Sequence, residues 1–183
     1  MKELAGLVLI NTGTGKGKTT AALGTALRAW GNGQRVLILQ FIKGGWKYGE
    51  LEAIAALGRI NGNIEIRSMG DGFVHHNREE NEAEFLRKKE IAQKAWETAV
   101  AEIMSDKWDL VILDEVNYAI YFDMLETEKV ADMIRNRPKR LNLILTGRYA
   151  RPELIDLADT VTEMNPIKHA FEKGIRARRG IEF

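Results

Sequence analysis

Short apolar runs alternate along the chain with longer segments in which apolar residues recur at helical spacing. The runs occupy residues 7–10, 36–41, 64–69, 110–114, 143–146 and 160–164. Several of them are almost continuously apolar, which is typical of strands that are covered on both faces of a sheet. The pattern therefore predicts a mainly parallel sheet of about six strands.

The segments between these runs have the period of helices. They predict helices over residues 18–30, 49–57, 80–105, 126–136 and 152–157. The fourth should end before Pro138, because a residue that precedes proline avoids helical angles. The fifth should begin at Pro152, since proline suits the first turn of a helix. Strands and helices that alternate in this way form an α/β fold of three layers, in which ligands bind at the carboxyl ends of the strands.

Length and composition are those of one ordinary globular domain, which we expect to cover residues 1–183. The formal net charge is +1, and neither acidic nor basic residues are in excess, so nothing points to nucleic acid or a membrane surface as a partner. No cysteine is present, which excludes disulfides, thiolate catalysis and thiolate metal sites. No apolar run is long enough to span a bilayer, and a cytoplasmic location is the default expectation.

The loop after the first predicted strand has the sequence NTGTGKGKTT, at residues 11–20. Glycine accepts positive φ and lets backbone N–H groups turn toward an anion, and the following helix directs the positive end of its dipole to the same place. Lys18 should reach the outer phosphates of a nucleotide, and the Thr19 hydroxyl should bind Mg²⁺. The loop departs from the usual P-loop, GxxxxGK[ST], because Thr12 stands where that pattern has its first glycine.

Two other predicted strands end in charged residues. The segment LVILDEV, at residues 110–116, ends in Asp114 and Glu115, and either acid could complete the Mg²⁺ shell directly or through water. In LTGR, at residues 145–148, Arg148 could bind phosphate bidentately or be an ordinary surface arginine. These residues indicate a Mg–nucleotide protein and leave open a small-molecule kinase or a nucleotide-switched ATPase.

A family resemblance narrows the function. The string TGTGKGKTTAALGTALRAWGNG, at residues 12–33, resembles the start of the P-loop ATP:corrinoid adenosyltransferases of the CobA/CobO/BtuR type, whose loop also lacks the first glycine. In that family asparagine usually stands where this chain has Thr14. The resemblance continues in order, over nearly the entire chain, through VLILQFIKGGWKYGE, MGDGF, LDEV, LTGR and KHAFEKGIRARRGIEF.

The resemblance implies a RecA-like P-loop NTPase fold and an unusual reaction. The Co(I) of a reduced corrinoid attacks the 5′ carbon of ATP, a cobalt–carbon bond forms, and triphosphate leaves, in adenosylcobalamin biosynthesis or salvage. It further implies a homodimer and a reduced flavoprotein as a candidate electron donor. Lys18 and Arg148 would be catalytic, and Thr19 with Glu115 or Asp114 would hold Mg²⁺. The ATP-binding residues implied by the match are Gly13, Thr14, Gly15, Lys16, Gly17, Lys18, Thr19, Thr20 and Arg28.

The resemblance also implies a corrinoid side, made by Trp46, Phe73, His75, Lys168 and His169. In the family, an aromatic pair spaced F-x-W packs under the corrin and displaces its lower axial ligand. Here Phe73 keeps the first position, but His75 replaces the tryptophan. His75 either fills the same space as a planar side chain or offers an imidazole nitrogen to cobalt. We favour the first interpretation, because a permanent lower ligand would defeat the mechanism.

Overall fold

A six-stranded sheet forms the middle layer of the protein in the computed structural model, which describes residues 5–44, 48–72 and 82–182. All of its strand pairings are parallel, and the strand order is β3-β2-β4-β5-β1-β6. The parallel sheet predicted from the apolar runs is confirmed. The strands are β1 (Val8–Thr12), β2 (Val36–Gln40), β3 (Ile64–Ser68), β4 (Leu110–Asp114), β5 (Asn142–Thr146) and β6 (Thr160–Glu163).

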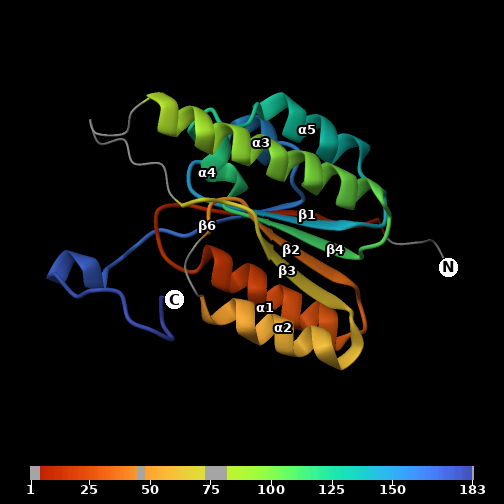
Figure 1. Ribbon diagram of the computed structural model, residues 1–183, viewed down its shortest axis with the longest axis horizontal. Coiled ribbons are helices and arrows are strands. Elements are labelled where there is room, and N and C mark those ends of the chain that lie inside the picture. Colours follow the sequence, from red (N-terminus) through yellow and green to blue (C-terminus); the bar gives the residue numbers. More distant parts are fainter. Residues whose placement is uncertain (1–4, 45–47, 73–81, 183) are drawn as a thin grey trace.

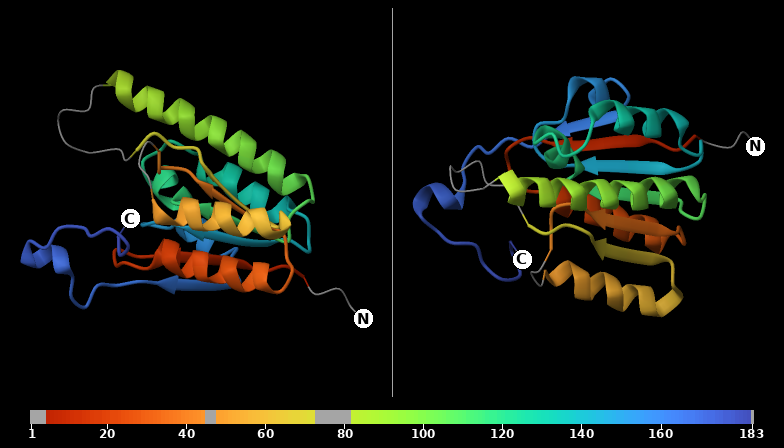
Figure 2. Two further views of the ribbon diagram at one scale, coloured as in Figure 1. Left: turned by 60° about the horizontal axis from the view of Figure 1, so that its bottom comes forward. Right: turned by 45° about the horizontal axis from the view of Figure 1, so that its top comes forward.

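Helices cover both faces of the sheet, as predicted. Helices α1 and α2 lie on one face, and α3, α4 and α5 lie on the other (Figures 1 and 2). The bounds are α1 (Lys18–Gly31), α2 (Gly49–Asn61), α3 (Glu82–Met104), α4 (Val116–Tyr121), α5 (Thr127–Asn136), α6 (Pro152–Ile155) and a 3-10 turn, η1 (Ala170–Lys173). Within the described ranges, none of the helices has the length and apolar character that crossing a membrane requires.

Alternation along the central strands divides the core in two. Leu37, Leu39 and Val111 pack in the cluster that contains α3, α4 and α5, whereas Ile38 and Ile112 pack in the cluster that contains α1 and α2. Every residue of β2 and β4 is therefore buried, which explains why these strands are apolar almost without interruption.

The helix boundaries predicted from Pro138 and Pro152 were correct, but the predicted end of the second helix was wrong and one helix was missed. Helix α5 ends at Asn136, and Arg137 before the proline is extended, with ψ 155°. Helix α2 runs on beyond the predicted end to Asn61, where Gly62 takes a left-handed conformation with φ 70°. Helix α4 was not predicted, because its six residues are too few to show a helical period.

The strand order brings the sequence motifs together. Strand β5 lies between β1, which leads into the P-loop, and β4, which ends in the acidic pair. This order gathers the carboxyl ends of three motif-bearing strands at one edge of the sheet.

The end of β6 supports the P-loop from the side. The Met164 amide donates to the Thr12 carbonyl at 2.8 Å, and the Gly15 amide donates to the Met164 carbonyl at 2.6 Å. A Cβ atom on Gly13 or Gly15 would lie only 2.4 or 2.7 Å from that carbonyl oxygen. Two of the alternating glycines are therefore required by the close passage of Met164, a reason that the sequence did not reveal.

Replacement of Gly15 by alanine should lower both the free energy of unfolding and the affinity for nucleotide, because the new methyl group would force β6 away from the loop. Gly24→Ala is the matched control. Gly24 lies inside α1 with nothing within 4 Å of an added Cβ, so alanine there should raise the free energy of unfolding by about 0.5–1 kcal/mol. Urea denaturation measures both changes, and a Gly15→Ala variant as stable as the unsubstituted protein would contradict the expectation.

Candidate functional site

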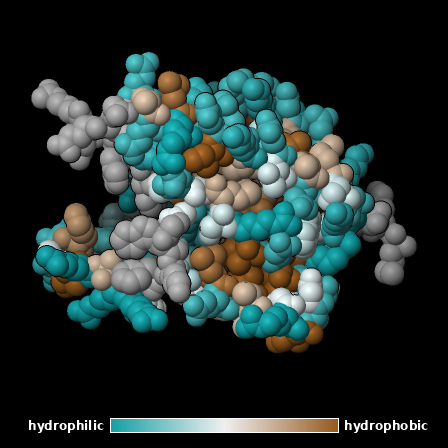
Figure 3. Space-filling model, viewed as in Figure 1, coloured by the Kyte–Doolittle hydropathy of each residue, from teal (hydrophilic) through white to brown (hydrophobic). Residues whose placement is uncertain are grey.

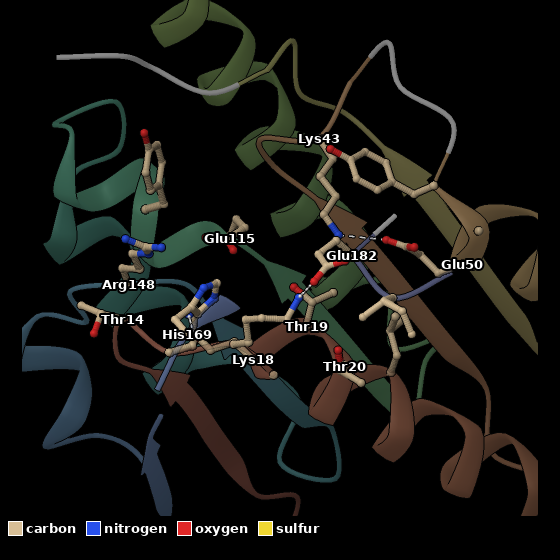
Figure 4. A pocket seen from close by; sticks show the side chains of 18 of the residues that line it. Thr14, Lys18, Thr19, Thr20, Lys43, Glu50, Glu115, Arg148, His169 and Glu182 are labelled. Carbon is tan, nitrogen blue, oxygen red and sulfur yellow. Dashed lines mark hydrogen bonds and ion pairs between the residues drawn. The ribbon is translucent and has the colours of Figure 1, made fainter. Parts of the chain in front are cut away.

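A cleft of about 810 Å³ opens at the carboxyl ends of the strands. Its floor is the P-loop, with Lys18 and Thr19 (Figure 4). Lys43 and Glu50, which lie after β2 and at the start of α2, line one side, and Arg148, which follows β5, lines another. Most of these groups are charged, so the cleft is suited to an anionic ligand with a metal ion.

The P-loop lysine is folded over its own loop. Lys18 is only 7% exposed, and its ammonium donates to the carbonyls of Gly13 and Gly15 at 2.8 and 2.7 Å. Burial lowers the pKa of Lys18, and Arg148 lowers it further, while Glu115 and Asp114 oppose the shift. An anionic phosphate in the cleft would favour the charged ammonium again.

Asp114 is the most highly connected side chain of the site. One carboxylate oxygen accepts from the hydroxyls of Thr19 and Thr146, each at 2.7 Å, and the other accepts from the Gln40 amide at 3.2 Å. The carboxylate is completely buried. Since the Thr19 hydroxyl gives its proton to Asp114, the lone pairs of the Thr19 oxygen are left for a metal ion.

Glu115 differs from Asp114 in its backbone conformation and in the hydrogen bonding of its carboxylate. Its backbone is left-handed, with φ 62°, and its amide donates to the Thr146 hydroxyl at 2.9 Å. No other residue in the described part of the chain forms a hydrogen bond with its carboxylate. Burial, and then the charge of Asp114, raises the pKa of Glu115 to about 7. A half-buried carboxyl group that accepts no hydrogen bond from the described residues, on a left-handed backbone, is a strong candidate for a ligand-binding residue.

These oxygen atoms fit a magnesium ion. Thr19 and Glu115 offer oxygen ligands in one cleft, and Mg²⁺ prefers one or two protein ligands together with phosphate oxygens and water. Among the described residues, no three His, Asp or Glu side chains cluster as a metal site made by protein alone. The set therefore suits an ion that arrives with a nucleotide.

Lys43 and Glu50 are site residues to which the sequence analysis gave no role. The Lys43 ammonium lies 2.9 Å from a Glu50 oxygen and 3.5 Å from an Asp114 oxygen, and 4.8 Å from the centre of the Tyr48 ring. Burial alone would lower the pKa of Lys43, but Asp114 and Glu50 raise it overall. The signal in the sequence was a lysine directly after a buried strand, in the segment FIKGG.

Three aromatic rings form a further part of the lining. Tyr118 and Phe122 belong to the region of α4, with ring centres 4.3 Å apart, and Tyr149 follows Arg148. Tyr121 links the group, with its ring centre 4.2 Å from that of Tyr149. The sequence analysis gave Tyr118 and Phe122 no role because it missed α4, and it gave Tyr149, which follows β5, no role either. Their faces offer flat apolar surface to a planar ligand.

The C-terminal tail, residues 164–182, turns back to the cleft. Lys16 and Glu182 form an ion pair at 3.0 Å, and His169 lines the cleft while its Nδ1 accepts from the Phe171 amide. Elsewhere the tail is exposed, with Phe171 at 79%, and Figure 3 shows it standing away from the body of the protein.

Most of the predicted nucleotide residues meet in the cleft, and a few predicted residues do not. The cleft is lined by the P-loop from Thr14 to Thr20, whereas the predicted Gly13 does not line it. Arg28 is exposed in the last turn of α1, at the far end of the helix from Lys18, and Lys168 is exposed and does not line the cleft. Trp46, Phe73 and His75 lie outside the described residues.

Comparison with known proteins identifies the family. Residues 4–183 match the family described as ATP:corrinoid adenosyltransferase BtuR/CobO/CobP. The chain belongs to this family. The corrinoid adenosyltransferase of Escherichia coli K12 is 38% identical over 97% of this chain and 86% of its own length. Corrinoid adenosyltransferase CobA of Salmonella typhimurium is 38% identical over the whole of this chain and 88% of its own length.

Membership of the adenosyltransferase family confirms the resemblance on which the sequence analysis relied. A solved structure, a KaiC-like protein of Pyrococcus horikoshii, is 17% identical over 91% of this chain and 76% of its own, with a TM-score of 0.49. The three-layer fold itself is established by the strand order and the two helical layers.

Glu115→Gln should stabilise the empty protein at pH 8. The folded-state pKa of Glu115, about 7, lies above the value of about 4.3 expected in the unfolded chain, so stability is lost as pH rises between these values. The glutamine variant carries no such charge, and the gain should be on the order of 1–3 kcal/mol at pH 8 and should vanish near pH 4.

Urea denaturation of metal-free protein at both pH values measures this effect. Asp114→Asn is the control: an NH₂ group replaces one of the two acceptor oxygens, so either Gln40 or the pair Thr19 and Thr146 loses its acceptor, and the protein should be destabilised. A Glu115→Gln variant that is less stable than the unsubstituted protein at pH 8 would show that the carboxylate is satisfied.

Proposed function

We propose that this chain transfers the 5′-deoxyadenosyl group of ATP to the Co(I) of a reduced corrinoid and releases triphosphate. The observation that carries the proposal is the family match over residues 4–183. It is supported by the cleft, which is lined by Lys18, Thr19 and Arg148.

The cleft supports a role for triphosphate as the leaving group. Lys18 rises from the loop that binds the phosphates, and Arg148 faces the same space from the end of β5. A bound Mg²⁺, held by Thr19 and Glu115, would supply further positive charge to the phosphate oxygens. Lys18 and Arg148 would stabilise the negative charge that develops on the triphosphate as it departs.

The adenosyl transfer needs no proton transfer to balance its atoms and charges. Cobalt supplies the electron pair of the new cobalt–carbon bond and is formally oxidised from Co(I) to Co(III). The bond between the 5′ carbon and oxygen breaks, and its electron pair stays on the oxygen of the leaving triphosphate. Protein residues therefore act by binding and orienting the two substrates and by stabilising charge on the leaving triphosphate. The carboxyl group of Glu115 is not required as a base.

The corrinoid would occupy the open side of the cleft. His169 lines this space, and the aromatic lining provided by Tyr118, Phe122 and Tyr149 supports binding of a planar ring. The proposal extends to Trp46, Phe73 and His75 through the family resemblance. A homodimer, a reduced flavoprotein donor and a cytoplasmic location are likewise proposals that rest on the resemblance and the composition.

The reaction can be tested directly. Mg-ATP and chemically reduced cobalamin should give an alkylcobalamin spectrum that light abolishes, together with one equivalent of inorganic triphosphate. Lys18→Met should lower the rate by about 100-fold or more, since it removes a preorganised cation from the leaving group.

The same assay separates the alternatives. Formation of ADP with phosphate transferred to an added small molecule would indicate a kinase. Formation of ADP and phosphate without an alkylcorrinoid would indicate a nucleotide-switched ATPase. Either result would refute adenosyl transfer.

A further inference from the structure

Lys43 is a half-buried cation at the wall of the nucleotide cleft that no recognised phosphate-binding motif includes. It follows β2, and its side chain is only 13% exposed, although lysine is almost always well exposed in proteins. In Figure 4 its side chain points into the cleft, with Glu115 between it and Arg148. The sheet order explains this placement, because β4, which ends before Glu115, lies between β2 and β5.

Three neighbours, from the start of α2 and the end of β4, hold Lys43 in place. Glu50, in the first turn of α2, accepts a hydrogen bond from the ammonium at 2.9 Å. The Tyr48 ring lies beneath the ammonium at 4.8 Å, and an Asp114 oxygen lies 3.5 Å away. A flexible side chain with four rotatable bonds is thus already ordered before any ligand binds, which reduces the entropy lost on binding.

The ammonium still has unused donors. Lysine carries three N–H donors, and within the described part of the chain only Glu50 takes a hydrogen bond from Lys43. Asp114 does not need Lys43 as a donor, because Thr19, Thr146 and Gln40 already satisfy both of its oxygens at shorter distances. The remaining donors of a largely desolvated cation therefore face an anion-binding cleft.

We propose that Lys43 is a second phosphate-binding lysine, which contacts the triphosphate from the side opposite Arg148. The choice of triphosphate as leaving group rests on the proposed function. When the bond between the 5′ carbon and oxygen breaks, its electron pair adds one negative charge to the triphosphate. Lys18, Lys43 and Arg148 would then surround the group whose charge increases, so Lys43 should bind the product triphosphate more strongly than it binds ATP.

A purely structural role for Lys43 makes a different prediction. If the ammonium served only to join Glu50 to Asp114, then replacing Lys43 and replacing Glu50 would weaken triphosphate binding by the same amount. If Lys43 binds phosphate, Glu50→Gln should leave triphosphate binding intact or strengthen it, because the competing carboxylate charge is gone and the ammonium remains.

The experiment compares Lys43→Met, Lys43→Arg and Glu50→Gln. Calorimetry without corrinoid gives the Kd of inorganic triphosphate and of Mg-ATP, and steady-state adenosylation gives kcat and KM. Lys43→Met should weaken triphosphate binding by about 10- to 100-fold, the range for a hydrogen bond to a charged group, and ATP binding by less. It should lower kcat more than it raises KM, while Lys43→Arg should recover much of both losses.

Melting temperatures show whether each variant is folded, and Lys43→Gln replaces Lys43→Met if the latter is not. A Lys43→Met protein that binds triphosphate within about twofold of the unsubstituted chain would overturn the proposal, as would a Glu50→Gln protein that loses as much affinity as Lys43→Met. Because the binding measurements contain no corrinoid, they test Lys43 even if the unsubstituted protein fails to adenosylate cobalamin.

Discussion

The fully buried Asp114 carboxylate is the interaction on which the nucleotide site depends. It accepts hydrogen bonds from Thr19 at the start of α1, from Thr146 at the end of β5 and from Gln40 at the end of β2. A buried carboxylate is costly unless its oxygens are satisfied, so these elements must stay in register for the charge to be tolerated. The requirement that keeps the sheet edge together thus also sets the position of the metal-binding hydroxyl of Thr19.

The cleft balances its cations with its own carboxylates before a ligand arrives. Lys16 pairs with Glu182, and Lys43 pairs with Glu50, whereas Glu115 remains without a hydrogen-bond donor among the described residues. Binding of an anionic nucleotide with a divalent cation would satisfy both kinds of group at once. In the empty site, charge is therefore disfavoured at Glu115, where burial raises the pKa to about 7, and at Lys18, where burial lowers the pKa.

The P-loop glycines serve two purposes that the motif alone does not distinguish. Gly17, with φ 112°, takes a backbone conformation that other residues rarely adopt, at the point where α1 begins. Gly15 is instead needed because the Met164 backbone passes too close for a side chain. An adenosyltransferase loop without the first glycine of the usual pattern is therefore supported by β6, a strand that lies far away in the sequence.

The sequence by itself determined the parallel sheet, the two helical layers, the P-loop, the acidic pair and the family. These follow from local periodicity and from short motifs whose residues are neighbours in the chain. Only the tertiary structure distinguished Asp114 as the satisfied acid from Glu115 as the free one. It also brought Lys43, Glu50 and the rings of Tyr118 and Tyr149 into the cleft. These roles depend on which strands are adjacent and on how closely backbones approach, and a pattern along one chain does not contain that information.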